Sequence, residues 1–164
     1  MNKRFAISGF TAVLAIAVAA GSVLAPSIAA TPGETVKMRQ ETMKQLGGHM
    51  KAIKTFLETG EGSAADVAKR ATEIGDIAGK IPSLFPEGTG MDKVKDPESG
   101  AKPEIWLEWE KFTAAAKGLG ERSSALNTAA SGGNNQLIAA AFEEMGKNGC
   151  GSCHKPYRVK LEKK

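Results

Sequence analysis

The chain has 164 residues and a formal net charge of +4, with 22 Lys and Arg against 18 Asp and Glu. This length is enough for one domain with a substantial core, but not for two. Two of the basic residues, Lys3 and Arg4, lie at the extreme N-terminus, so the rest of the chain is nearly neutral and gives no indication of nucleic-acid binding.

The first 29 residues have the features of a secretory signal peptide. Two basic residues precede an uncharged, apolar run over residues 5–25, and Pro26 interrupts that run. We expect cleavage after Ala29, with Ala30 as the second choice, because small residues precede the cut. A run of about 20 apolar residues could also form an uncleaved anchor, but the small residues and Pro26 favour cleavage. Both alternatives predict export to the periplasm, and no later segment could span a membrane.

Residues 30–164 are predicted to form one all-α domain, because apolar residues recur with a period near 3.5 and alternation of period two is absent. Helices are predicted over residues 34–59, 63–80, 103–130 and 134–163, with a loop over 85–102. Short first and third connections predict an antiparallel up-down-up-down four-helix bundle. The predicted inward positions, in helix order, are Val36, Arg39, Met43, Leu46, Met50, Ile53 and Leu57; Val67, Ala71, Ile74, Ala78, Ile81 and Leu84; Ile105, Trp109, Phe112, Ala116, Leu119, Ser123 and Leu126; Leu137 or Ile138, Ala141, Met145, Gly149 and Cys153.

The strongest chemical signal is the segment Cys-Gly-Ser-Cys-His that ends at His154. Residues three apart on a helix share a face, so Cys150 and Cys153 can bond the two vinyl groups of one haem, with His154 as the proximal iron ligand. A thioredoxin-like pair would need a strand, and a zinc site would need four ligands, of which only His49 could be another. A plain disulfide leaves His154 unexplained. One covalent haem c is therefore expected.

This motif, near the C-terminus of an exported four-helix chain, resembles the class II c-type cytochromes, the cytochrome c prime (cytochrome c') family. The segment Arg39-Gln40-Glu41-Thr42-Met43-Lys44 resembles the family's Arg-Gln-x-x-Met/Leu segment, and residues 103–106 resemble the start of its third helix. The resemblance continues through Tyr157-Arg158 and covers the whole mature chain. Pro156 departs from the family pattern and predicts a local kink.

The resemblance makes the sixth iron ligand the central question. Five-coordinate members keep an apolar distal pocket and bind small gases such as NO or CO, whereas six-coordinate, low-spin members place a Met sulfur on iron and transfer electrons. Met43 and His154 each lie about eight residues, or roughly 12 Å, from the same end of the predicted bundle. We therefore expect Met43 as the distal ligand of an electron-transfer protein of the low-spin branch. The alternative is a gas-binding protein with Met43 as a non-ligating distal residue.

The other helical methionines are less well placed to bind the iron by this geometry, although the geometry does not exclude Met91, in the loop, as a ligand. Arg39 occupies an inward position where a charge needs a partner, so we expect Arg39 and Gln40 to bind the haem propionates. Arg158 lies one turn after His154 and reaches either a propionate or solvent.

No acid–base pair is predicted opposite the haem ligand, so we expect no enzyme activity. The basic tail is either a solvated helix end or a docking patch for an acidic redox protein of the periplasm. Many members of the family dimerise through their first two helices, which leaves both a monomer and a homodimer open. The tail residues are Lys155, Arg158, Lys160, Lys163 and Lys164.

Overall fold

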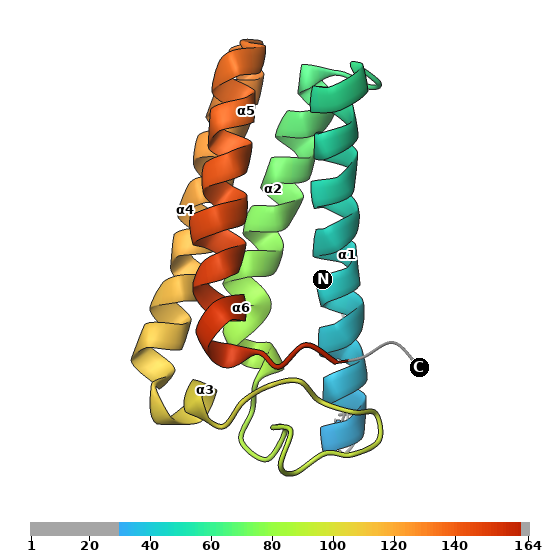
Figure 1. Ribbon diagram of the computed structural model, residues 1–164, viewed down its shortest axis with the longest axis vertical. Helices are drawn as coiled ribbons and strands as arrows, with labels where there is room; N and C mark the ends of the chain where they lie inside the picture. The colour runs from blue at the N-terminus through green and yellow to red at the C-terminus, as the bar shows by residue number, and fades with distance from the viewer. Residues whose placement is uncertain (1–29, 162–164) are drawn as a thin grey trace, which may run out of the picture.

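A computed structural model describes residues 30–161 of the chain. The signal peptide predicted for residues 1–29, with its cleavage after Ala29, lies outside the described residues. The elements form an antiparallel four-helix bundle, as the sequence predicts (Figure 1). Its long helices are α1 (Pro32–Thr59), α2 (Ala64–Lys80), α4 (Trp109–Ser131) and α5 (Asn135–Glu144), which continues through the π-helix η2 (Met145–Cys150) into α6 (Gly151–Tyr157). Within residues 30–161, no helix is both long enough and apolar enough to cross a bilayer.

Helix α1 begins at a capping box. The Thr31 hydroxyl accepts a hydrogen bond from the backbone N–H of Glu34 at 3.3 Å, and the Glu34 carboxylate accepts one from the backbone N–H of Thr31 at 2.7 Å. Together they satisfy two N–H groups that the first turn leaves without helical partners. The helix ends at Gly60, whose φ of 75° favours glycine. Both boundaries follow from local sequence.

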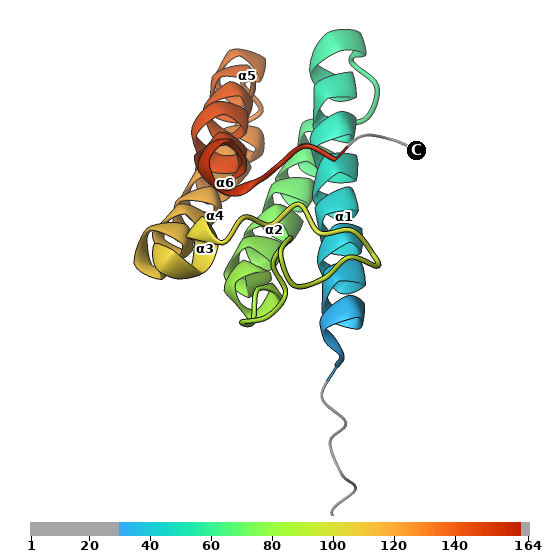
Figure 2. The same ribbon diagram turned by 60° about the horizontal axis from the view of Figure 1, so that its bottom comes forward.

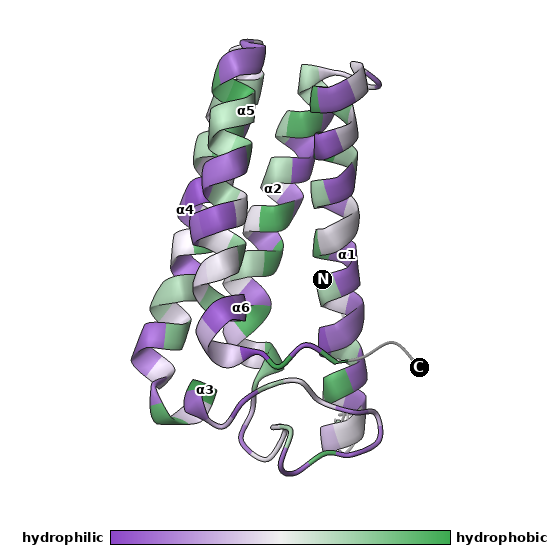
Figure 3. Ribbon diagram, in the orientation of Figure 1, coloured by the Kyte–Doolittle hydropathy of each residue, from purple (hydrophilic) through white to green (hydrophobic). Residues whose placement is uncertain are grey.

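The core is densest between α2 and α4, the helix pair in closest contact. Their predicted inward residues are nearly all buried, and Figure 3 shows strongly hydrophobic bands along α2. Helix α2 ends at Lys80, as predicted, and Pro82 then lies in the short 3-10 helix η1 (Ile81–Leu84). The buried residues of this pair are Val67, Ala71, Ile74, Ala78, Phe112, Ala116, Leu119, Ser123, Leu126 and Ala130.

The third predicted helix is in fact two helices. Backbone angles of −119° and 40° at Glu108 separate α3 (Glu104–Leu107) from α4. The prediction that Trp109 faces inward is wrong, because the break rotates it until 38% of its surface is exposed. Of the two candidates for the first inward residue of α5, Ile138 is buried and Leu137 is exposed, so Ile138 is the inward one.

The prediction that the last helix continues toward Lys163 is also wrong. Pro156 lacks an N–H, and the helix ends one residue later. The next residues, 158–161, form an extended segment, here named the C-terminal strap, which crosses from α6 toward α1 (Figure 2). Arg158 forms an isolated antiparallel bridge with Ala101, and the Val159 N–H donates to the Gly100 carbonyl at 2.9 Å.

Candidate haem site

A cavity of about 430 Å³ lies at the end of the bundle where α1, η1, α6 and the C-terminal strap meet. Met43 from α1 and His154 from α6 both line it, although 111 residues separate them in the sequence. This agrees with the expectation that the two side chains lie at one level of the bundle. The other lining residues are Arg39, Gln40, Lys44, Ile81, Phe85, Gly100, Ala101, Ile105, Phe112, Cys153, Tyr157, Arg158, Val159, Lys160 and Leu161.

The predicted attachment residues lie together at the start of α6. Cys150 and Cys153 are free, half-buried thiols that pack against the core, and Cys153 lines the cavity. Burial raises the pKa of both thiols, so they remain protonated at neutral pH. The donor set fits a c-type haem, because two thiols three residues apart precede a histidine that lines the cavity.

The attachment motif is preceded by the π-helix η2, which ends at its first cysteine. It spans Met145–Cys150 and so changes the helical register immediately before the motif. Gly149 is buried against α4, where a Cβ would lie 3.0 Å from the Leu119 Cδ1 atom. Any larger residue at this position would have to displace the Leu119 side chain, so glycine suits the close approach of η2 to α4. Wide turns of this kind frequently occur at functional sites.

His154 is half-buried, and its pKa is lowered, first by burial and then by the nearby positive charge of Arg158. A lowered pKa favours neutral imidazole, which is the form that binds iron. Across the cavity, Met43 is half-buried and packs beside the core. The side chains of Ile81, Phe85 and Phe112 give this part of the cavity an apolar wall.

Arg39 lines the cavity but has partners that the sequence did not indicate. Its guanidinium nitrogens donate to the carbonyl of Thr89 at 2.9 Å and to the Ser99 hydroxyl at 2.9 Å. Weaker bonds reach the Thr89 hydroxyl at 3.3 Å and the Leu84 carbonyl at 3.4 Å. The guanidinium also lies 4.4 Å from the centroid of the Phe85 ring. The hydrogen bonds of Arg39 thus hold the loop after η1 against α1.

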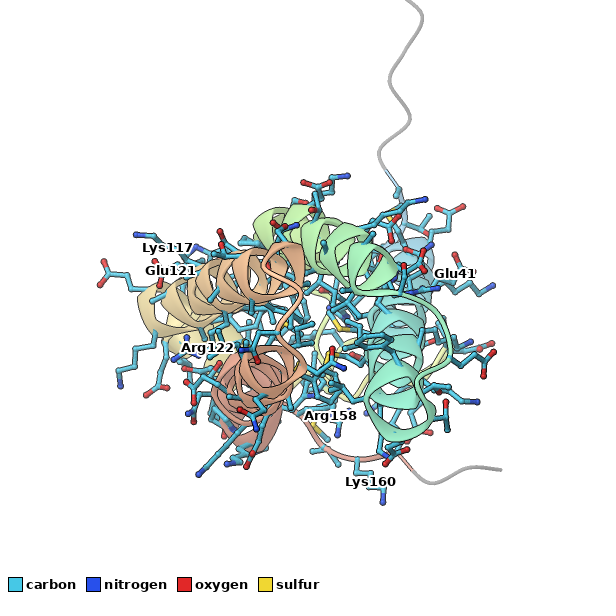
Figure 4. The ribbon with its side chains drawn as sticks, turned by 90° about the horizontal axis from the view of Figure 1, so that it is seen from above. Glu41, Lys117, Glu121, Arg122, Arg158 and Lys160 are labelled. Atoms are coloured by element: carbon cyan, nitrogen blue, oxygen red, sulfur yellow. The ribbon has the colours of Figure 1, made fainter. Side chains whose placement is uncertain are left out.

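Burial lowers the pKa of Arg39 to about 10. Within the described part of the chain it has no carboxylate partner, so a buried positive charge remains beside the cavity. Gln40 donates to the Glu98 carbonyl at 2.9 Å. The exposed Arg158 lines the cavity, and Figure 4 shows it between α6 and α1, with Lys160 farther out. Propionate binding by Arg39, Gln40 and Arg158 stays a prediction.

His49 lies outside the cavity lining, with its Nδ1 atom 3.3 Å from a carboxylate oxygen of Glu73 on α2. Among residues 30–161, no cluster of three or more His, Cys, Asp or Glu side chains could hold a metal ion. The zinc interpretation therefore gains no support. Sequence reasoning missed the buried polar residues Thr89 and Ser99, because nothing in an irregular loop distinguishes them from solvated residues.

Comparison with known proteins identifies the family. Residues 34–158 match the family described as Cytochrome C'. This chain belongs to the cytochrome c' family. Over 130 residues it is 32% identical to the cytochrome c' of Pararhodospirillum photometricum, covering 79% of this chain and 99% of that protein. It is 35% identical over 126 residues to cytochrome c-556 of Agrobacterium tumefaciens strain B2A, covering 76% and 97% respectively.

Solved structures agree with this assignment. A cytochrome c' described as having an unusual ligand-controlled dimer dissociation superimposes with a TM-score of 0.73 and 30% identity, covering 81% of this chain and all of that one. A carbon monoxide-bound variant of the cytochrome c' from Alcaligenes xylosoxidans shares the fold, with a TM-score of 0.68 and 24% identity over 80% of this chain and 98% of that one. Cytochromes c' carry one covalently bound haem c, and the cavity lined by Cys153 and His154, with Cys150 three residues before Cys153, fits that group.

Proposed function

We propose that this cytochrome c' is a periplasmic, five-coordinate haem protein that binds small gases such as NO or CO. Cys150 and Cys153 attach the haem, His154 is the proximal ligand, and Met43 lines the distal pocket without ligating iron. When bound, the haem supplies an iron atom that takes a diatomic ligand. The observation that carries the proposal is the apolar wall of the cavity that His154 shares.

The apolar wall favours a neutral diatomic ligand. Ile81, Phe85 and Phe112 are each at most 8% exposed and offer no hydrogen-bonding group to an anion. Contact with these three side chains would cost a charged ligand part of its hydration, whereas a neutral diatomic ligand has little hydration to lose. Two related structures support the binding of a small gas. One is a cytochrome c' whose dimer dissociation is ligand-controlled, and the other holds carbon monoxide.

Electron transfer is the second candidate. One observation favours it: the thioether of Met43 lines the same cavity as His154. Ligation of iron by Met and His raises the reduction potential. This candidate needs a partner redox protein, and the cations Lys44, Arg158 and Lys160 at the cavity would favour an acidic one.

Absorption spectroscopy of the purified holoprotein separates the two candidates. We expect a high-spin ferric spectrum and ready carbon monoxide binding by the ferrous protein. Met43→Ala should leave the coordination number unchanged, and Met50→Ala, on the same helix, is the matched control. A far-red sulfur–iron charge-transfer band without carbon monoxide binding, lost in Met43→Ala alone, would establish the electron carrier instead.

We also propose that Arg39, Gln40 and Arg158 bind the haem propionates. The buried charge of Arg39, which has no carboxylate partner among the described residues, supports this role most directly. Arg39→Gln should lower the reduction potential of the holoprotein, because a positive charge near the iron disfavours the oxidised state. An unchanged potential in a folded Arg39→Gln variant would exclude the contact.

A further inference from the structure

The chain contains a single tyrosine, Tyr157, and it lies in the wall of the haem cavity. It is 5% exposed and lies three residues after His154, so the two residues share a face of α6. Its hydroxyl donates a hydrogen bond to Oε2 of Glu108 at 3.0 Å. A buried phenol beside a haem site is thus bonded directly to a carboxylate.

Glu108 is held in place for this contact. It occupies the break between α3 and α4, and the Lys111 ammonium donates to its other oxygen, Oε1, at 2.8 Å. The bond from Lys111, followed by that from Tyr157, lowers the pKa of Glu108, which is therefore ionised at neutral pH. Burial, followed by the bond to Glu108, raises the pKa of Tyr157, so the phenol keeps its proton at rest. Tyr157 is therefore a proton donor, and the ionised Glu108 is its proton acceptor.

Aromatic rings connect this pair to the surface. The Phe112 ring lies 5.6 Å from the Tyr157 ring in an edge-to-face arrangement, and its centroid is also 5.6 Å from that of the Trp109 ring. Phe112 lines the cavity, whereas Trp109 is 38% exposed. The exposure of Trp109, which its inward sequence position did not predict, places an oxidisable indole at the outer end of this contact.

We propose that Tyr157 is a redox-active residue that gives one electron to the haem after a hydroperoxide has oxidised it, while its phenolic proton passes to the carboxylate of Glu108. The O–H bond of Tyr157 breaks, Glu108 becomes protonated, and a neutral tyrosyl radical remains. Trp109 then passes an electron from a reductant at the surface to Tyr157, and the proton returns from Glu108. This function protects the haem from oxidative damage.

Electrons and protons balance over two such passages. Reduction of a hydroperoxide consumes two electrons and two protons. An organic hydroperoxide gives an alcohol and water, and hydrogen peroxide gives two waters. Each passage carries one electron from a reductant such as ascorbate through Tyr157, and the oxidised reductant releases one proton to solvent, which supplies one of the two that the hydroperoxide consumes. An acceptor within hydrogen-bond reach promotes each loss of the phenolic proton. The proposal rests on the five-coordinate site proposed above, because a hydroperoxide must reach the iron.

Rapid-freeze electron paramagnetic resonance tests the proposal on the ferric holoprotein mixed with hydrogen peroxide. Because Tyr157 is the only tyrosine, any tyrosyl signal belongs to it, and Tyr157→Phe should abolish that signal. Glu108→Gln should lower the radical yield by about tenfold. Glu110→Gln, an exposed neighbour, is the matched control and should leave the yield unchanged.

Two further measurements address the individual roles. Ultraviolet titration without peroxide should show a lower Tyr157 pKa in Glu108→Gln than in the parent protein, whereas Glu110→Gln should not change it. The tyrosyl radical should persist longer in Trp109→Phe than in Trp106→Phe when ascorbate is present. Equal lifetimes in these two variants would remove Trp109 from the route.

Carbon monoxide binding separates failure of this inference from failure of the proposed function. If the ferrous protein binds carbon monoxide but peroxide yields no tyrosyl signal, Tyr157 is not redox-active and gas binding stands. If carbon monoxide does not bind, the peroxide experiment is done with Met43→Ala, which frees the sixth position. Absence of the tyrosyl signal from that variant overturns the inference as well.

Discussion

The α2–α4 half of the bundle and the α1–α6 half use the same helical periodicity in different ways. Predicted inward residues of α2 and α4 are almost completely buried, as Ile74 at 1% and Leu126 at 0% illustrate. The corresponding residues of α1, Met43, Leu46 and Met50, are only half-buried, and Met43 lines the cavity. In one half protein packs on protein, and in the other the helices border a cavity.

This difference shows that a helix can have inward residues without having a protein partner for them. Figure 3 shows most of α1 as hydrophilic or neutral in a view where α2 carries strongly hydrophobic bands. Arg39 and the C-terminal strap connect α1 and α6 to the loop after η1 instead. We infer that the haem supplies contacts that α1 lacks, and that α2 and α4, which pack mainly on each other, depend on it far less.

Removal of the haem should therefore affect the two halves unequally, and this is the largest expected effect. The double variant Cys150→Ala/Cys153→Ala should lose covalent haem, and amide exchange in residues 43–50 should rise by about two orders of magnitude. Exchange in α2 and α4 should change far less. Haem staining of denaturing gels and hydrogen-exchange mass spectrometry give the two readouts, with Ser152→Ala as the control. Uniform loss of protection in all four helices would refute the comparison.

Truncation of one side chain in each half sharpens the contrast. Leu126→Ala should cost about 2–5 kcal/mol, because it leaves a cavity in a fully buried site. Leu46→Ala should cost roughly 1 kcal/mol, because Leu46 is already half-exposed. Urea unfolding of the holoprotein measures both values. Equal losses would show that α1 packs as tightly as α4.

The C-terminal strap should be sensitive to a single methyl group. A Cβ at Gly100 would lie 2.6 Å from the Val159 carbonyl oxygen, so Gly100→Ala must displace the strap. We expect a cost of about 1–2 kcal/mol and faster exchange of the Val159 amide. Gly79→Ala is the control, since nothing lies within 4 Å of its Cβ position. An unchanged melting temperature in Gly100→Ala would mean that the strap is not fastened there.

The smallest expected effect concerns the start of α1. Thr31→Ala should lower stability by about 1 kcal/mol at neutral pH. The two hydrogen bonds with Thr31 lower the pKa of Glu34 from 4.5, so their contribution is present above that pH and is lost as the pH falls through the lowered value. The difference in melting temperature between the variant and the parent should therefore shrink in acid without vanishing, because the bond from the Glu34 N–H to the Thr31 hydroxyl does not titrate. A difference that is undiminished at about pH 3 would contradict this assignment.

Local sequence patterns predicted most of the fold. The ends of α1 and α2 and the helical period of apolar residues depend on neighbours within a few positions, which a sequence displays directly. The capping box at Thr31, which starts α1 at Pro32 instead of residue 34, was not predicted. The spacing of the haem-attachment motif is local in the same sense. Its expected opposition to Met43 followed from helix lengths alone; both residues line one cavity, and their opposition across a haem stays a prediction.

Long-range contacts explain what the sequence did not predict. Glu108 interrupts the third helix where its carboxylate meets Tyr157, 49 positions away. Thr89 and Ser99 become buried only because Arg39 reaches them across the bundle. No pattern in the nearby sequence distinguishes these residues from ordinary loop residues.

The sequence by itself determined the helices, their antiparallel order and the two thiols and histidine of the haem site, because each depends on spacing along one helix. Only the tertiary structure decided which inward positions border protein and which border the cavity. It also decided where α6 ends and what Tyr157 contacts. Those outcomes depend on contacts between distant segments. Pro156 lacks an N–H and ends α6, and Gly100 lacks a side chain, so the C-terminal strap can lie against the loop at the cavity.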